Sequence, residues 1–198
     1  MKLGIIVGST RQGRQTAKVG AWVATAAQQV EGAEVEVLDL VDYPMPFFDE
    51  AISPRYNQNR DPHPDVQKFL DKLAEQDAYI VVTPEYNHSV PGVLKNAFDY
   101  IGYELKRKPS AVVSHGSVGG ARAAMHLKEI LSEGMSVPIQ SAVALTGMVA
   151  MGGILDDDGN LSEDLKTNPY GPQTALNTML NELKWYSDAL STARAASA

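Results

Sequence analysis

Short apolar runs alternate along this chain with segments whose apolar residues recur at helical spacing, and this alternation constrains the fold more than any other feature. The first run, Leu3 to Gly8, is continuously apolar and ends in glycine, which is typical of a strand buried on both faces. Strands that alternate with helices indicate βαβ units, so the pattern predicts an α/β fold with helices on both faces of a five-stranded parallel sheet. The expected strands are 3–8, 35–38, 78–83, 111–114 and 137–146, and the expected helices are 16–30, 65–75, 90–101, 121–132 and 173–190.

The chain is expected to form one domain. It has 198 residues, shows no internal repeat and contains no stretch rich in Gly, Pro and Ser that would separate two domains. We therefore expect a single doubly wound domain over residues 1–191. Residues 192–198 are small and simple, and we expect them to form a flexible tail.

Charge and cysteine content exclude several classes of function. Lys and Arg number 17 against 24 Asp and Glu, and a net charge of −7 argues against a nucleic-acid partner or a membrane surface, both of which need a basic face. No apolar run is long enough to span a membrane. The absence of cysteine excludes thiolate metal sites and cysteine nucleophiles, and it fits the reducing compartment of a cytoplasmic protein.

The loop after the first strand, Gly8 to Thr16, has the composition of a phosphate site. Three hydroxyl groups and two guanidinium groups precede a helix whose N-terminus offers unpaired N–H groups and a positive dipole end. The loop is not a Walker sequence, and Gly8 and Gly13 do not complete the dinucleotide fingerprint. We interpret it as a site for a phosphate monoester, and the alternative is a polar connecting loop in which Thr16 caps the helix.

The loop after the third strand, Thr83 to Gly92, is stiffened by two prolines and presents Tyr86, Asn87 and His88 beyond a strand end. A rigid backbone with a tyrosine and an amide suits edge-on hydrogen bonding to a planar heterocycle. A plain turn before the next helix explains the local sequence equally well.

The loop after the fourth strand, Ser114 to Gly120, contains three glycines that allow a ligand to approach the backbone closely. Neither Ser114 nor Ser117 has the glycine flanks of a nucleophile elbow, so acyl transfer is not expected.

Taken together, the residues of these loops resemble the NADPH-dependent FMN reductases, a flavodoxin-like family. The match in order and spacing runs from Leu3 to about Gly147. The segments that carry it are Gly8-Ser9-x-Arg11, Pro84-Glu85-Tyr86-Asn87 and Pro91-Gly92-x-Leu94-Lys95-Asn96-Ala97-x-Asp99. The resemblance implies a flavodoxin-like sheet with strand order 2-1-3-4-5, an FMN cofactor, NADPH or NADH as co-substrate, and a homodimer or homotetramer paired through the helices after strands three and four.

The resemblance also implies a set of cofactor-binding residues. Ser9, Arg11 and Thr16 would hold the FMN phosphate, with Arg14 and Gln15 beside it. Because the family often has Ser or Asn where Arg14 and Thr16 stand, it stays open whether Arg14 faces FMN or the extra phosphate of NADPH. The residues expected along the isoalloxazine ring are Pro84, Glu85, Tyr86, Asn87, His115, Gly116 and Ser117.

These features predict an FMN-dependent NAD(P)H oxidoreductase that works by a ping-pong mechanism. Hydride would pass from NADPH to FMN and then to a small-molecule acceptor such as a flavin, a quinone, an azo compound or a metal oxyanion. No side chain is required as an acid or base, so no catalytic residue is named. The alternative is a flavodoxin-like electron-transfer protein that does not itself oxidise NADPH, although nearby arginines favour the reduced flavin and argue against it.

Two further features bear on metal binding and on assembly. No metal site is expected, because the four histidines lack ligand spacing and Asp156 to Asn160 fits an Asp-Gly turn better than a calcium loop. The stretch 42–63 is long for a connection, and either it packs on its own core or it reaches across a dimer toward the neighbouring flavin, which we favour.

Overall fold

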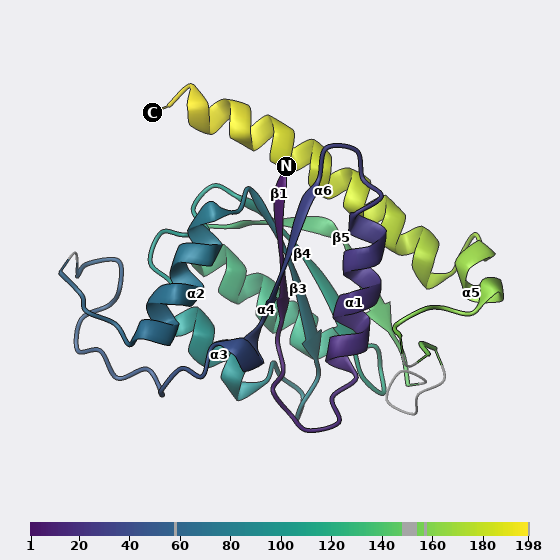
Figure 1. The fold of residues 1–198 in the computed structure, drawn as a ribbon, viewed down its shortest axis with the longest axis horizontal. Coiled ribbons are helices and arrows are strands. Elements are labelled where there is room, and N and C mark those ends of the chain that lie inside the picture. The colour runs from purple at the N-terminus through teal and green to yellow at the C-terminus, as the bar shows by residue number, and fades with distance from the viewer. Residues whose placement is uncertain (58, 148–153, 157, 198) are drawn as a thin grey trace.

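The computed structural model describes residues 1–57, 59–147, 154–156 and 158–197 of the chain (Figure 1). Its strands are β1 (Lys2–Val7), β2 (Glu34–Asp39), β3 (Ala78–Pro84), β4 (Pro109–His115) and β5 (Val137–Leu145). Its helices are α1 (Thr16–Ala27), a 3-10 turn η1 (Leu40–Asp42), α2 (Pro64–Glu75), α3 (Gly92–Asp99), α4 (Ala121–Glu133), α5 (Glu163–Thr167) and α6 (Pro172–Ala195).

All strand pairs of the sheet are parallel, and the strand order is β2-β1-β3-β4-β5, which confirms the predicted fold. Val7 lies beside Val82, and Pro84 lies beside His115. The carboxyl ends of β1, β3 and β4 therefore meet at one edge, with β1 and β3 central. This register places the three loops singled out in the sequence next to one another.

The sheet is covered on both faces because the central strands carry buried apolar residues on each side. One core cluster joins α1 and α6 to the sheet through residues such as Ile5, Val23 and Leu180. The other joins α2, α3 and α4 to it through residues such as Ile6 and Phe69. Each such side chain contributes about 1.5–3 kcal/mol on burial, so the two clusters supply the main driving force for this arrangement.

Several boundaries differ from the sequence expectations. Helix α6 continues through Ala195 into the segment expected to be a flexible tail, and Arg194 donates a hydrogen bond to the carbonyl of Arg107 at 2.8 Å. This contact fixes the end of the helix, and composition gives no sign of it. Pro138 lies within β5, which is an edge strand of the sheet, where a missing N–H donor is tolerated.

Part of the stretch 42–63 packs against α3 of its own chain. The side-chain amide of Asn96 in α3 accepts from the N–H of Phe48 at 2.8 Å and donates to the carbonyl of Pro46 at 2.7 Å. On the outer side of this stretch the side chains of Phe47 and Tyr56 are 86% and 80% exposed. These contacts tie Pro46 and Phe48 to α3 of the same chain, and the reach toward a neighbouring flavin, which needs a second subunit, stays a prediction.

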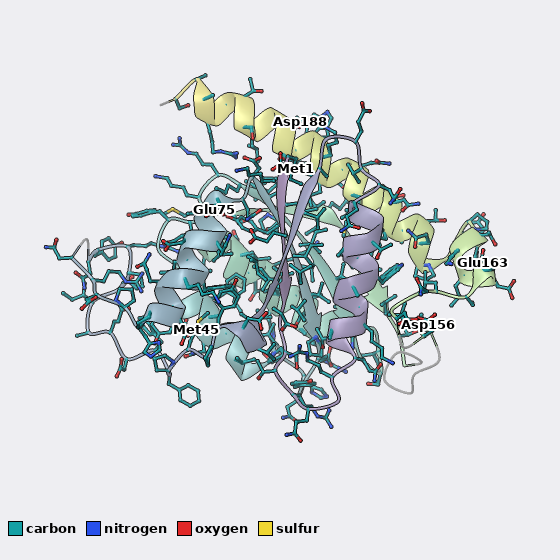
Figure 2. All side chains as sticks on the ribbon, viewed as in Figure 1. Met1, Met45, Glu75, Asp156, Glu163 and Asp188 are labelled. Atoms are coloured by element: carbon teal, nitrogen blue, oxygen red, sulfur yellow. The ribbon has the colours of Figure 1, made fainter. Side chains whose placement is uncertain are left out.

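The Asp-Gly turn expected after the fifth strand is present where the structure describes it. Leu155 and Leu161 form an antiparallel bridge, and Asp156, labelled in Figure 2, accepts hydrogen bonds from the N–H groups of Asp158 and Asn160. The carboxylate of Asp156 therefore stabilises its own turn, as in an ordinary Asx turn.

Candidate functional site

The candidate site lies at the edge of the sheet opposite Met1, where the loops after β1, β3 and β4 come together (Figures 1 and 2). Doubly wound sheets bind their ligands at this edge. Each loop is held in place by contacts that the fold provides, and the loops also contact one another.

The loop after β1 leaves its strand in close contact with β3. The N–H of Gly8 donates to the carbonyl of Val82 at 2.9 Å, and a Cβ at Gly8 would come within 2.8 Å of Leu94 and 2.9 Å of that carbonyl. Only glycine fits here, so its presence in the sequence follows from the tight packing of the loop base.

Backbone N–H groups of this loop are free to bind an anion. In the part of the chain that the structure describes, the N–H groups of Thr10, Gly13, Thr16 and Ala17 have no hydrogen-bond acceptor. Those of Thr16 and Ala17 form the first turn of α1, where the helix dipole is positive. Free donors at a helix N-terminus fit a phosphate group.

Arg11 supplies an exposed positive charge at the same loop. It has no carboxylate partner among the described residues, and its guanidinium carbon lies 5.8 Å from the centre of the Tyr86 ring. The hydroxyl groups of Ser9 and Tyr86 are 2.9 Å apart. Ser9, Arg11 and Tyr86 thus connect the loops after β1 and β3.

Arg14 is held inside the protein. Its guanidinium donates to the carbonyl of Ser9 at 2.9 Å and to the carboxylate of Asp39 at 2.5 Å, and the two side chains are only 14% and 19% exposed. Burial raises the pKa of Asp39, while hydrogen bonding from Val41 and the charge of Arg14 oppose that rise. Gln15 occupies the N-cap position of α1, and its side chain makes no capping hydrogen bond.

Thr16 and His115 are joined by a buried hydrogen bond. The Thr16 hydroxyl lies 3.0 Å from Nε2 of His115, and both residues are buried. Burial lowers the pKa of His115 to about 4, so the imidazole is neutral at physiological pH. The structure therefore places these two predicted site residues against each other, linking α1 to β4.

Glu85 uses its carboxylate to cap α4. Its oxygens accept from the backbone N–H of Arg122 at 3.0 Å and from the guanidinium of Arg122 at 2.5 Å. Burial would raise the pKa of Glu85, but these hydrogen bonds lower it on balance. The backbone N–H of Glu85 donates to the carbonyl of His115 at 2.9 Å, so the loop after β3 is fixed to both β4 and α4.

The rest of the loop after β3 is a two-residue turn. Tyr86 and Ser89 exchange both backbone hydrogen bonds, at 3.0 and 3.1 Å, and Asn87 and His88 between them have φ of 50° and 66°. This geometry is typical of a tight hairpin turn. Pro84, the last residue of β3, is buried and pairs with His115 of β4. This pairing fixes the position at which the turn leaves the sheet.

The loop after β4 is shaped by glycine. Gly120 has φ of 72°, and a Cβ there would lie 2.9 Å from the backbone N and O of His115. The hydroxyl of Ser114 donates to the carbonyl of Gly119 at 2.7 Å, and the N–H of Gly116 donates to Leu145 at 3.2 Å. Ser117 is exposed at the tip of the loop.

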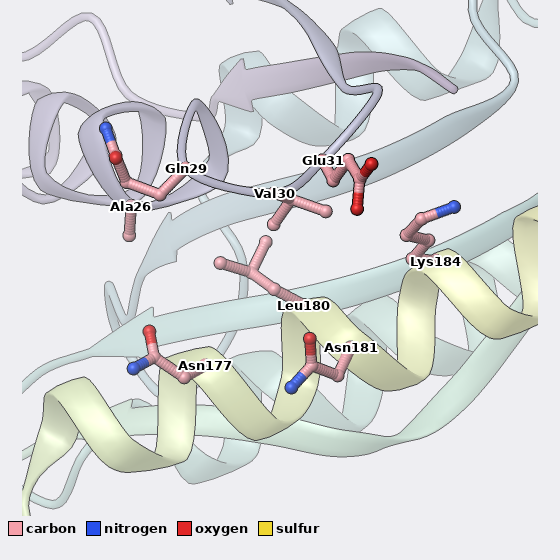
Figure 3. Close-up of a pocket in the computed structure, with 8 residues that line it drawn as sticks. All are labelled: Ala26, Gln29, Val30, Glu31, Asn177, Leu180, Asn181 and Lys184. Carbon is pink, nitrogen blue, oxygen red and sulfur yellow. The ribbon is translucent and has the colours of Figure 1, made fainter.

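Other hollows and clusters of the described residues lie outside this site. A hollow of about 490 Å³ lies between α6 and the carboxyl end of α1, at the amino-end edge of the sheet (Figure 3). Its lining residues are Ala26, Gln29, Val30, Glu31, Asn177, Leu180, Asn181 and Lys184.

The described residues contain no group of three or more His, Asp or Glu side chains placed to hold a metal ion. None of the helices among these residues is both long and apolar enough to cross a membrane.

The fold and the site define a class of protein: a flavodoxin-like α/β protein whose loop after the first strand carries backbone N–H groups without an acceptor among the described residues. The family model for NADPH-dependent FMN reductases matches residues 1–149. The chain therefore belongs to the NADPH-dependent FMN reductase family, which confirms the resemblance found in the sequence and the expected class of enzyme, an oxidoreductase that works with FMN and NAD(P)H.

Similar proteins agree with this assignment. The chain is 31% identical over 171 residues to an NAD(P)H-dependent FMN reductase of a Nectria species, covering 82% of this chain and 84% of that one. It is 32% identical over 129 residues to an NAD(P)H-dependent FMN reductase of Schizosaccharomyces pombe, and that match covers 65% of this chain and 64% of the relative's length. The solved NAD(P)H:(acceptor) oxidoreductase of Paracoccus denitrificans superposes with a TM-score of 0.68 at 22% identity, over 96% of this chain and 97% of that one.

Two residues of the site, Asp39 and Arg122, were not identified as site residues from the sequence. Asp39 ends β2, which lies directly beside β1, so its position at a strand end was the available signal. Arg122 follows Gly119 and Gly120 at the start of a helix, but nothing in the sequence pairs it with Glu85, 37 residues earlier.

Proposed function

We propose that this protein is an FMN-dependent NAD(P)H oxidoreductase that passes hydride from NADPH to FMN and then reduces a small-molecule acceptor by a ping-pong mechanism. The observation that carries the proposal is the meeting, at one sheet edge, of free N–H donors, the exposed cation of Arg11 and the rigid turn at Tyr86. The free donors suit a phosphate group, and a planar ring beside the turn is part of the proposal. FMN supplies the redox chemistry when it is bound.

The phosphate is proposed to bind at the N-terminus of α1. The free N–H groups of Thr10 and Gly13 and the charge of Arg11 support this assignment, and Ser9 and Thr16 stand at the same loop. Gln15 is close by at the N-cap. Because the hydroxyl of Thr16 already contacts His115, its backbone N–H is the group that we expect to contact the phosphate.

The ring is proposed to lie along the loops after β3 and β4. Pro84, Glu85, Tyr86 and Asn87 would border it mainly through their backbone, since the Glu85 carboxylate is committed to α4. Gly116 and Ser117 would approach its pyrimidine edge, with the neutral imidazole of His115 buried behind them. Backbone N–H groups at that edge would stabilise the negative charge of the reduced ring. No side chain is assigned as an acid or base.

The visible spectrum of the purified protein tests the function. We expect a flavin spectrum that bleaches on anaerobic addition of NADPH and returns when a quinone is added. Flavin that is reduced by dithionite but not by NADPH or NADH would instead support an electron-transfer protein without its own NADPH oxidation. Failure to retain or take up FMN would contradict both.

Arg11→Ala tests the phosphate assignment. Removing this charged donor should weaken FMN binding by about 1–3 kcal/mol. The binding of riboflavin, which lacks the phosphate, should change little. Lys106→Ala, which removes one exposed positive charge at the other edge of the sheet, is the matched control. An unchanged dissociation constant for FMN in Arg11→Ala would mean that the phosphate binds elsewhere.

The acceptor and the assembly are also proposals. A quinone reductase of Escherichia coli is 33% identical over 134 residues, which supports a quinone as one acceptor. A flavin, an azo compound and a metal oxyanion are the other acceptors to assay.

The exposed side chains of Phe47, Ile52, Tyr56 and Met125 support a homodimer or homotetramer, which light scattering would measure. We propose a cytoplasmic location on the absence of cysteine alone, and fractionation of the source cells tests it.

A further inference from the structure

We propose that Arg14 and Asp39 form a strut that positions the phosphate loop, and that Arg14 contacts neither the phosphate of FMN nor that of NADPH. This inference rests on the proposed FMN site. It concerns the question that the sequence left open, namely which ligand the second arginine of the loop serves.

The strut is defined by three hydrogen bonds within the protein. One terminal nitrogen of Arg14 donates to the carbonyl of Ser9 at 2.9 Å, and the other donates to Asp39 Oδ2 at 2.5 Å. The remaining oxygen of Asp39 accepts from the N–H of Val41 at 3.3 Å. Because Asp39 is the last residue of β2 and lies beside Val7 of β1, the strut rests on the sheet itself.

The strut orients a backbone donor. The described chain contains no cis peptide bond, so the carbonyl of Ser9 and the N–H of Thr10 point in opposite directions across one planar peptide. Drawing the Ser9 carbonyl toward Arg14 therefore turns the Thr10 N–H away from Arg14, and this N–H has no acceptor within the described residues. The backbone N–H of Arg14 also donates to the carbonyl of Arg11 at 3.2 Å, which closes the turn that carries Arg11.

Burial and charge argue against a phosphate contact by Arg14. Its side chain is 14% exposed and its partner carboxylate lies within direct contact, so its charge is largely neutralised where it stands. To reach a phosphate, the guanidinium would have to leave both Asp39 and Ser9, and a half-buried carboxylate without its partner is costly. Arg11 is exposed and has no such partner, so it is the cation that the loop offers to a ligand.

The two roles predict opposite results for Asp39→Asn. If Arg14 were a phosphate ligand held back by Asp39, removing the carboxylate charge would free the guanidinium and leave FMN affinity unchanged or improved. If Arg14 acts through the strut, the same change weakens the ion pair that holds the Arg14 guanidinium in place. The hydrogen bond from Arg14 to the Ser9 carbonyl is then weaker as well, and FMN binds less tightly. The parent protein and Asp39→Asn both keep the charge of Arg14, so a difference in FMN affinity between them reports on the position of the guanidinium.

The experiment is a double-mutant cycle on the full chain, with FMN and riboflavin titrated by fluorescence quenching. We expect Arg14→Met and Asp39→Asn each to raise the FMN dissociation constant about tenfold, the effect of one hydrogen bond, and the double variant to raise it by the same factor instead of a hundredfold. Riboflavin binding should be the same in all four proteins, because only the phosphate loop is disturbed.

Three outcomes would overturn the strut. They are an unchanged or lowered FMN dissociation constant in Asp39→Asn, additive effects in the double variant, and an equal loss of riboflavin binding, which would indicate general destabilisation. Arg11→Ala, titrated alongside, keeps the proposed site separate: if it weakens FMN binding while Asp39→Asn does not, the site stands and the strut fails. Arg14→Lys should behave as Arg14→Met, since one ammonium cannot span both acceptors in the geometry of a guanidinium.

Discussion

Replacing His115 by Gln should remove a pH dependence from the stability of this protein. His115 is 5% exposed, and its Nε2 lies 3.0 Å from the hydroxyl of Thr16. A glutamine places an amide nitrogen near the position of Nε2, so it can keep a hydrogen bond to Thr16 without titrating. The variant therefore separates the protonation of the imidazole from its packing.

The direction follows from the two pKa values. Burial lowers the pKa of His115 from 6.5 to about 4 in the folded protein, so between these values the unfolded chain binds more protons than the folded one. The free energy of unfolding therefore falls as the pH drops through this window. The whole difference corresponds to about 3 kcal/mol, of which about 2 kcal/mol is lost between pH 7 and pH 5.

Urea unfolding at pH 7 and pH 5, followed by circular dichroism, provides the measurement. The parent protein should lose about 2 kcal/mol more between these pH values than His115→Gln, since all other titrating groups are common to both. His126→Gln, which removes an exposed histidine of α4, is the matched control. Equal losses in the parent and in His115→Gln would refute the buried neutral state of His115.

Two further predictions concern the loops. Gly120→Ala should lower the free energy of unfolding by at least about 2 kcal/mol, because φ at Gly120 is 72° and the new Cβ would lie 2.9 Å from the backbone of His115. Thermal unfolding measures this loss. A loss no larger than that of an ordinary surface substitution would contradict the geometry. Asn96→Ala should release the stretch 42–63, because it removes the bonds to Phe48 and Pro46, at a cost of about 1–2 kcal/mol. Limited proteolysis should then cut within 42–63 before the rest of the chain, and an unchanged cleavage pattern would show that other contacts hold this stretch.

The sheet could be predicted from the sequence because its signals are local. A strand buried on both faces has to be apolar throughout, as Leu3 to Val7 and Ala78 to Val82 are, and the helices between strands carry their own periodicity. The end of α6 could not be predicted, because Arg194 is fixed by Arg107, a residue 87 positions away. A composition of small residues describes a tail equally well until that contact is known.

The candidate loops could be predicted for the same reason, but the use of their side chains could not. Hydroxyls and arginines between Val7 and a helix N-terminus lead to the prediction of a phosphate site from composition and position. That Arg14 is paired with Asp39 depends on β2 lying beside β1. That Thr16 meets His115 depends on the burial of both, which only the packed structure shows.

The contacts that join the three loops also bear on how the protein loses its fold. Ser9 and Tyr86 are 77 residues apart in sequence, and Thr16 and His115 are 99 apart. A ligand bound across these loops would act as a non-covalent cross-link between βα units that fold from distant parts of the chain, and by mass action it would stabilise only the state in which all three are docked. Saturating FMN should therefore slow unfolding far more than it speeds refolding if the loops come together after the central strands have paired, and an equal effect on both rates would place loop docking before the folding barrier.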